Sequence, residues 1–125
     1  MDINNIDSAL DEIMSINGAL AAAVIDWESG MTLGMRTNGK FDIEMAAAGN
    51  SEVVKAKMAV MRSTHLTGHI KDMLITLTDQ MHIIAMVEDQ PELCLYVAMD
   101  GQKANLALAR KIGRASCRER VSSPV

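Results

Sequence analysis

Residues 70–99 read IKDMLITLTDQMHIIAMVEDQPELCLYVAM, and this stretch decides the fold class. It contains three apolar runs of strand length, IKDMLITL, MHIIAMVE and ELCLYVAM. The gaps between them, residues 78–80 and 89–91, are too short for a crossover connection, so each run must return antiparallel to the one before it. The stretch therefore predicts three neighbouring strands of an antiparallel sheet.

The residues before this stretch predict a long helix. It is expected over residues 43–66, after Asp42, whose side chain suits a helix N-cap, and before the stop signal Thr67-Gly68. One apolar face is marked by Val54, Met58 and Met61.

Further upstream the sequence predicts a hairpin and a first helix. Two short apolar runs, residues 19–25 and 33–35, flank the turn-rich Glu28-Ser29-Gly30, which is typical of a β-hairpin. Before the hairpin, apolar residues recur at three- and four-residue steps, as in an amphipathic helix, at Ile3, Ile6, Leu10 and Ile13.

A third helix is expected from about Ala104, within GQKANLALARK at residues 101–111. The predicted order is then α-β-β-α-β-β-β-α. Because the strands are apolar on both faces, we expect helices on both sides of the sheet. The predicted fold is a three-layer α/β sandwich around a five-stranded antiparallel sheet, with the long helix on one side and the terminal helices on the other.

This order of elements resembles the roadblock family, that is, roadblock/dynein light chain domains of bacterial or archaeal type. Two segments carry the resemblance, ALAAAVIDWESGMTLG at residues 19–34 and LYVAMDGQKANLALARK at residues 95–111. The resemblance covers about residues 6–111, and profilin-like and longin-like domains share related layouts. It implies a single domain over residues 1–111. It also implies a small homodimeric or heterodimeric module that serves a Ras-like small GTPase as a regulator or scaffold.

The resemblance places the dimer interface on the long helix and on the strand within residues 70–77. The partner is then a second copy or a paralogous roadblock protein. An exposed edge strand as apolar as MLITL independently favours pairing, since unpaired apolar edges aggregate. The candidate interface residues are Val54, Met58, Met61, His65, Leu74 and Thr76.

Trp27 is the single tryptophan and stands at the predicted hairpin tip. An exposed aromatic side chain can anchor a partner, which makes Trp27 a candidate partner contact. It can equally pack down on the sheet, and the sequence leaves both open.

A second hypothesis is a profilin-like sensory domain that holds a small ligand between the sheet and a helix. Such a site needs a pocket with a few convergent polar groups. The sequence offers Thr76, His82 and Tyr96 as scattered candidates.

Several kinds of chemistry lack support in the sequence. Residues 1–111 hold nine Lys or Arg against fifteen Asp or Glu, which argues against nucleic acid as a partner. His65 and His69 have the spacing of two metal ligands on a helix, but Gly68 interrupts that helix. Cys94 lies in an apolar strand pattern typical of a buried thiol. We expect no enzymatic activity, metal or cofactor.

The sequence also bears on location. No window reaches the roughly 18 apolar residues needed to span a bilayer, and the N-terminus lacks a basic and then apolar leader. Only two cysteines are present, too few and too dissimilar in setting for a disulfide framework. We therefore expect a cytoplasmic protein without a membrane span.

Residues 112–125, IGRASCRERVSSPV, differ from the rest of the chain. They carry three arginines against one glutamate and no apolar periodicity. IGRASCRERV matches, letter for letter, one reading frame of a sequencing adapter. We therefore interpret this segment as a non-native tail and leave it out of the fold. A different codon series in the coding DNA across residues 112–121 would contradict this interpretation. The alternative is a genuine basic tail that contacts acidic partners.

Overall fold

The computed structural model describes residues 5–39, 41–105, 107 and 112. The helices and strands among them, in chain order, are α1 (Ile6–Met14), β1 (Ala19–Asp26), β2 (Met31–Thr37), α2 (Ile43–Ser63), β3 (Asp72–Thr76), β4 (Gln80–Met86) and β5 (Leu93–Asp100). The order α-β-β-α-β-β-β confirms the prediction as far as β5.

The five strands form one antiparallel sheet in the order β2-β1-β5-β4-β3. β1 and β5 are central and almost wholly buried, whereas β2 and β3 are the two edges. The register pairs Ala23 with Tyr96 in the centre and Leu74 with Ile83 next to the β3 edge. This confirms the five-stranded antiparallel sheet and shows that the MLITL strand is an edge.

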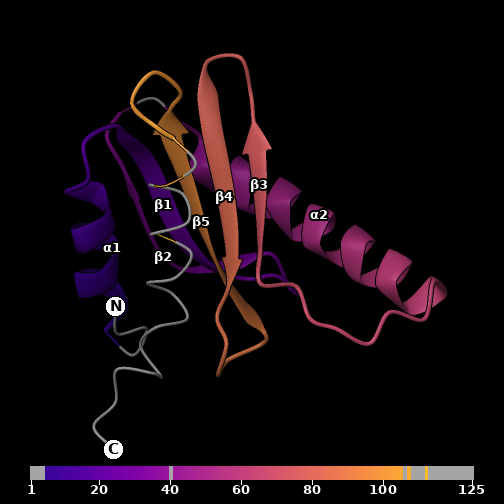
Figure 1. Cartoon of the computed structure of the whole chain (residues 1–125). Helices are drawn as coiled ribbons and strands as arrows, with labels where there is room; N and C mark the ends of the chain where they lie inside the picture. The colour runs from indigo at the N-terminus through magenta and orange to yellow at the C-terminus, as the bar shows by residue number, and fades with distance from the viewer. Residues whose placement is uncertain (1–4, 40, 106, 108–111, 113–125) are drawn as a thin grey trace, which may run out of the picture.

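Helices cover both faces of the sheet, so the molecule has three layers (Figure 1). Strand residues alternate between the two faces and build two separate cores. The core on the α1 side contains Leu10, Ile13, Ala22, Val24, Ile83, Ala85, Val87, Leu93, Leu95, Val97, Met99 and Ile112. The core on the α2 side contains Ala21, Ala23, Ile25, Ile43, Ala47, Val54, Ile84, Met86, Cys94, Tyr96 and Ala98.

Both helices begin at a capping side chain. Asp42 Oδ1 accepts a hydrogen bond from the Met45 N–H at 3.1 Å, and Asn5 caps α1 in the same way. α1 is further fixed to the edge strand β2, because Arg36 makes ion pairs of 2.9 Å with both Asp7 and Asp11. The N-cap predicted for the long helix is therefore confirmed.

The long helix ends earlier than the sequence predicts. α2 stops at Ser63, and the φ angle of His65 is 59°, a left-handed conformation that turns the chain before Gly68 is reached. The predicted end at Leu66 was wrong because a non-glycine residue makes the turn that we had assigned to Thr67-Gly68.

The predicted third helix falls largely outside the described residues. Of the residues there that the structure does describe, Ala104 and Asn105 are not helical, whereas Ala107 and Ile112 are. Ile112, the first residue of the segment that we interpreted as a non-native tail, is 2% exposed and packs in the core on the α1 side.

Candidate interaction surface

The β3 edge has backbone groups that point away from the sheet. Lys71 C=O accepts from the Met86 N–H at 2.9 Å, and the Leu77 N–H donates to Gln80 C=O at 2.8 Å. Hydrogen-bonded positions alternate along an antiparallel pair, so the odd-numbered residues of β3 bond to β4. The N–H and C=O groups of Leu74 and Thr76 therefore face outward, where another strand could pair with them.

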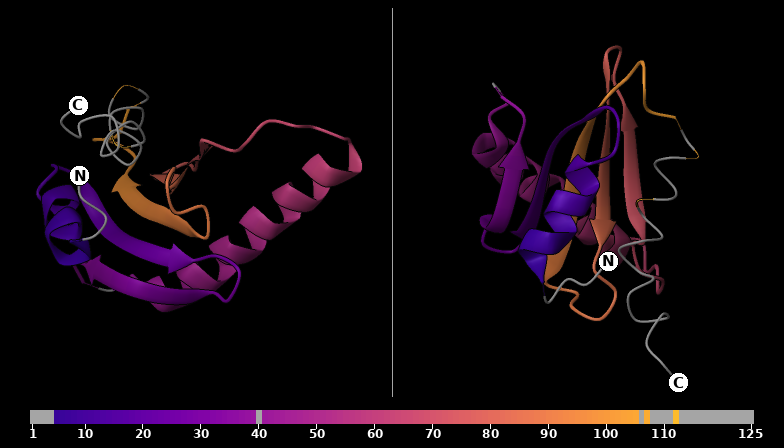
Figure 2. Two further views of the ribbon diagram at one scale, coloured as in Figure 1. Left: turned by 90° about the horizontal axis from the view of Figure 1, so that it is seen from below. Right: turned by 90° about the vertical axis from the view of Figure 1, so that its left-hand side faces the viewer.

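Helix α2 extends beyond this edge. Figure 1 shows it crossing one face of the sheet and continuing past β3, and Figure 2 shows its far end standing clear of the strands. Its buried residues, Ile43, Ala47, Ser51 and Val54, all lie in its first twelve positions. We call the remainder of α2 and the loop that returns to β3 the outer segment (residues 55–71).

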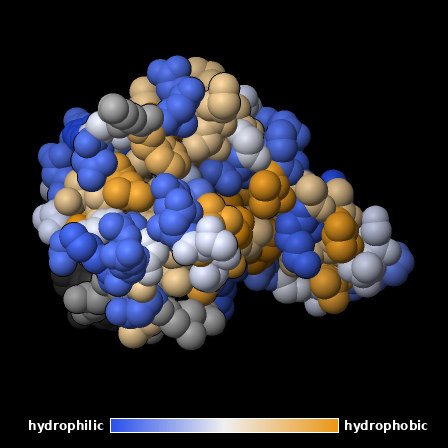
Figure 3. Space-filling view, turned by 90° about the horizontal axis from the view of Figure 1, so that it is seen from above, coloured by the Kyte–Doolittle hydropathy of each residue, from blue (hydrophilic) through white to orange (hydrophobic). Residues whose placement is uncertain are grey.

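Apolar side chains are exposed on and beside the outer segment. Val60 is 49% exposed, Leu66 57%, and Val53, just before the segment, 40%. Figure 3 shows hydrophobic residues along the projecting end of α2 and where it meets the body. Sequence reasoning missed all three residues because it followed the face that packs on the sheet. The seven-residue spacing of Val53 and Val60 was the available signal.

The residues predicted for the dimer interface lie in different environments. Met58 and Met61 are partly buried on the inner side of the outer segment, His65 is exposed at its turn, and Thr76 is exposed on the β3 edge. Leu74 is partly buried and packs toward the core on the α1 side. These five residues therefore lie on the β3 strand or on the outer segment.

Val54 is the exception among those residues. It is 0% exposed and belongs to the core between α2 and the sheet. As an interface contact the prediction was wrong at this position, because α2 is still packed on its own sheet there and begins to overhang only afterwards.

Comparison with solved structures identifies the architecture. Myxococcus xanthus MglB superposes with a TM-score of 0.78 at 14% identity, over 96% of this chain and 94% of that one. The roadblock/LC7 domain from Streptomyces avermitilis gives 0.75 at 11% identity, over 90% and 92%. A structure described as MglB with tetrameric arrangement gives 0.77 at 14%, over 93% and 85%.

The chain has the roadblock fold. No protein-family model matches the sequence, and no curated protein matches it either. This chain shares its fold with these structures, but at 11–14% identity most side chains differ. This explains why the sequence resembled the family only in its order of elements and in a few short patterns.

In this roadblock fold Trp27 packs down on the sheet. Its indole Nε1–H donates to Pro91 C=O at 2.8 Å, its backbone N–H donates to Glu92 C=O at 3.3 Å, and its ring borders the core on the α2 side. Of the two readings left open by the sequence, the structure shows the packed one. Trp27 ties the β1–β2 turn to the loop between β4 and β5.

We predict that Trp27→Phe lowers the free energy of unfolding by about 1 kcal/mol, because it removes the hydrogen bond to Pro91 and keeps an aromatic ring. Urea denaturation followed by circular dichroism measures this directly. Glu28→Gln, an exposed change one residue away, serves as the control and should leave the midpoint unchanged. An unaltered midpoint in Trp27→Phe would show that the indole hydrogen bond contributes nothing.

His82 and Tyr96 meet between the sheet and α2. His82 Nε2 donates to Gln80 Oε1 at 2.8 Å, which leaves Nδ1 to accept from the Tyr96 hydroxyl at 3.4 Å. Phe41 lies against both rings. Thr76 pairs with Met81 and so lies on the other face of the sheet. The three residues proposed for a ligand pocket therefore do not line one site.

Burial lowers the pKa of His82, and Asp79 opposes this shift. The folded state thus holds His82 neutral at pH values where the unfolded chain binds a proton. Its contribution to stability is complete above the unfolded pKa of about 6.5 and is lost as the pH falls through the folded pKa. Protonation also removes the acceptor that Nδ1 offers to Tyr96.

We therefore predict that His82→Gln flattens the loss of unfolding free energy between about pH 7 and pH 5. Denaturant titrations of both proteins at several pH values give the two slopes. Exposed carboxylates contribute equally to both, so the difference reports His82. Parallel slopes would contradict the prediction.

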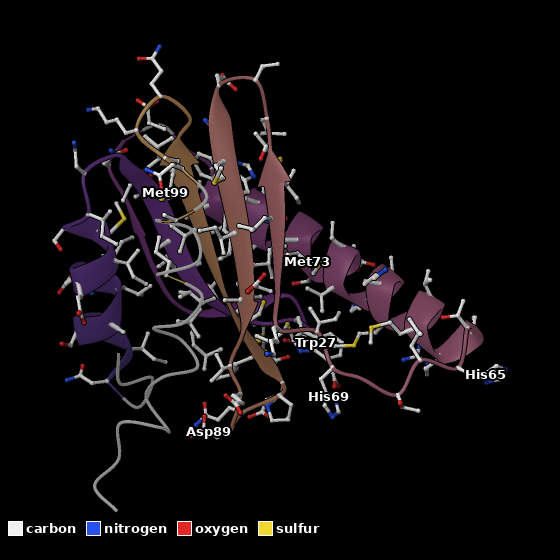
Figure 4. The ribbon with its side chains drawn as sticks, viewed as in Figure 1. Trp27, His65, His69, Met73, Asp89 and Met99 are labelled. Atoms are coloured by element: carbon white, nitrogen blue, oxygen red, sulfur yellow. The ribbon has the colours of Figure 1, made fainter. Side chains whose placement is uncertain are left out.

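Cys94 and the pair His65 and His69 were the remaining candidates for chemistry in the sequence. Burial, and secondarily Asp26, raises the pKa of the Cys94 thiol to about 12, so it stays neutral. Figure 4 shows His65 at the outer end of α2 and His69 further along the returning loop, not on one helical face. Among the described residues, no group of three His, Cys, Asp or Glu could hold a metal, and no helix is long and apolar enough to cross a membrane.

Proposed function

We propose that this protein is a non-enzymatic interaction module that dimerises through β3 and the outer segment. Its partner in the dimer is a second copy or another roadblock-fold protein. The dimer in turn binds a Ras-like small GTPase, as a regulator or as a scaffold in signalling. The expected location is the cytoplasm, where a buried free thiol such as Cys94 stays reduced.

One observation supports the proposed dimer: the apolar edge strand β3 lies beside helix α2, which projects past it. A strand with outward N–H and C=O groups at Leu74 and Thr76 is a template for pairing. A twofold axis beside β3 would join two sheets into one and place each outer segment next to the other subunit. The exposed side chains of Val60 and Leu66 then lose contact with water.

The GTPase partner is supported by the family resemblance of the sequence and by the fold. We expect no catalytic residue from this chain, so any effect on GTP hydrolysis would come from positioning residues of the GTPase itself. Among similar solved structures, one has a tetrameric arrangement of MglB, which shows that this fold supports assembly between like chains in that protein.

Two measurements test the proposal. Light scattering of the full chain at two concentrations should give the mass of a dimer. Calorimetric titration with Ras-like GTPases of the same genome, loaded with GDP or with a non-hydrolysable GTP analogue, should show binding that prefers one nucleotide state. A monomer at both concentrations contradicts the first part, and a dimer that binds no GTPase in either state contradicts the second.

A further inference from the structure

The charge of this protein is distributed unevenly. The outer segment contains Lys55, Lys57, Arg62 and Lys71 and no aspartate or glutamate. The whole chain has twelve Lys and Arg and sixteen Asp and Glu, so the rest of it has eight cations and sixteen acids, a net charge of −8. A basic projection therefore stands on an acidic body.

Three of the four cations of the projection make no ion pair with the described residues of their own subunit. Lys55 reaches the preceding turn of α2 and pairs with Glu52 at 3.3 Å, an exposed pair. Within the described part of the chain, Lys57, Arg62 and Lys71 make no ion pair. Three positive charges thus remain available to a neighbour.

The position of the outer segment determines which neighbour it can reach. It lies beyond the β3 edge of its own sheet, so a molecule placed on the far side of β3 can contact it (Figures 1 and 2). In the proposed dimer that molecule is a second copy, whose body carries the opposite charge.

We propose that the basic outer segment of each subunit docks against the acidic body of the other, so that charge complementarity is part of what holds the homodimer together. This inference rests on the dimer proposed above. Complementary charge across an interface also selects partners, because a chain with a basic or neutral body is disfavoured.

Nucleic acid or an anionic membrane fits the same cations less well. Both present extended negative charge, which the acidic body next to the projection repels. A second copy presents its negative charge as a surface of limited size, and it offers apolar contacts to Val60 and Leu66 as well. The second copy is therefore the occupant that the observations favour.

The test compares two charge reversals in the full-length protein. Lys57→Glu changes the outer segment, and Lys103→Glu makes the same change in net charge at an exposed position in the turn after β5. Sedimentation equilibrium gives the dimer Kd of each variant and of the parent at low and high NaCl. The Debye length shrinks from about 30 Å at 0.01 M salt to about 3 Å at 1 M, so this range screens exposed pairs.

We expect Lys57→Glu to weaken the dimer about tenfold at low salt, since the twofold places the change in the interface twice. Lys103→Glu should change Kd less than about twofold. Salt should weaken the parent dimer and narrow the gap between the variants. A dimer whose Kd ignores salt and both substitutions overturns this inference and leaves the proposed function standing. A protein that stays monomeric under every condition overturns the proposed function itself.

Discussion

Replacing Thr76 by proline is expected to convert the proposed dimer into a folded monomer. Proline has no N–H, and the N–H of Thr76 points outward from β3, so no hydrogen bond to β4 is lost. The preceding residue, Ile75, is already extended, as a residue before proline must be. The substitution is therefore tolerated by the subunit but not by a strand that pairs with β3.

The expected size follows from the backbone groups left without partners. In a twofold pair each subunit loses one N–H, and one carbonyl opposite it remains unsatisfied, at about 1–3 kcal/mol each. Two such losses, at least about 2 kcal/mol together, should raise the dimer Kd at least about thirtyfold. Light scattering over a concentration series measures the change, and far-UV circular dichroism shows that the fold is retained.

Thr76→Val is the matched control, because it changes the same side chain and keeps the backbone N–H. It should remain a dimer. If both variants dimerise as the parent does, strand pairing at β3 is not the mode of assembly. If both are monomers, the Thr76 side chain matters and the backbone argument is wrong.

The sheet could be predicted from the sequence because its signals are local. Short gaps such as Thr78-Asp79-Gln80 force antiparallel returns, and Asp42 marks the start of α2 within one turn. The strand order β2-β1-β5-β4-β3 was not predicted and came from the structure, since no short-range rule places β5 beside β1.

The candidate surface could be predicted only in outline. Val54 and Val53 are neighbours in sequence and both are apolar, yet one is 0% exposed and the other 40%. Which of them faces the sheet depends on the exact rotation of α2, and where α2 leaves the sheet depends on the width of the sheet. Neither quantity is written in the spacing of residues along one helix. The positive charge of the outer segment could be counted from the sequence. That this charge lies beyond the β3 edge, where a second subunit could contact it, could be seen only in the structure.

Gly101 must lack a side chain because it lies close to the backbone of the β3–β4 turn, and only the structure shows this. In the sequence it follows Asp100 and reads as an ordinary turn residue. In the structure its N–H donates to Asp79 C=O at 2.8 Å, and a Cβ at this position would lie 2.8 Å from the Asp79 carbonyl carbon and 2.9 Å from Gln80 N. These are backbone atoms of the β3–β4 turn, which cannot move aside as a flexible side chain does.

We predict that Gly101→Ala lowers the free energy of unfolding by about 1–3 kcal/mol, the usual cost of overpacking. Gly49→Ala is the matched control: Gly49 lies in α2, and an added Cβ there meets nothing within 4 Å. That change should stabilise by about 0.5–1 kcal/mol, since alanine favours the helix. Both substitutions stiffen the unfolded chain alike, so this effect cancels in the difference between them, which contains the close approach at Gly101 and the helix preference at Gly49.

Urea denaturation of the two variants at one protein concentration gives this difference, about 1.5–4 kcal/mol if both expectations hold. The result also bears on assembly, because the turn that Gly101 contacts leads into β3 and fixes the end of the edge strand. A destabilised Gly101→Ala protein should therefore dimerise less well than its Gly49→Ala counterpart. Equal stability of the two variants would mean that the β3–β4 turn shifts freely, and the edge on which the dimer depends would then not be held by β5.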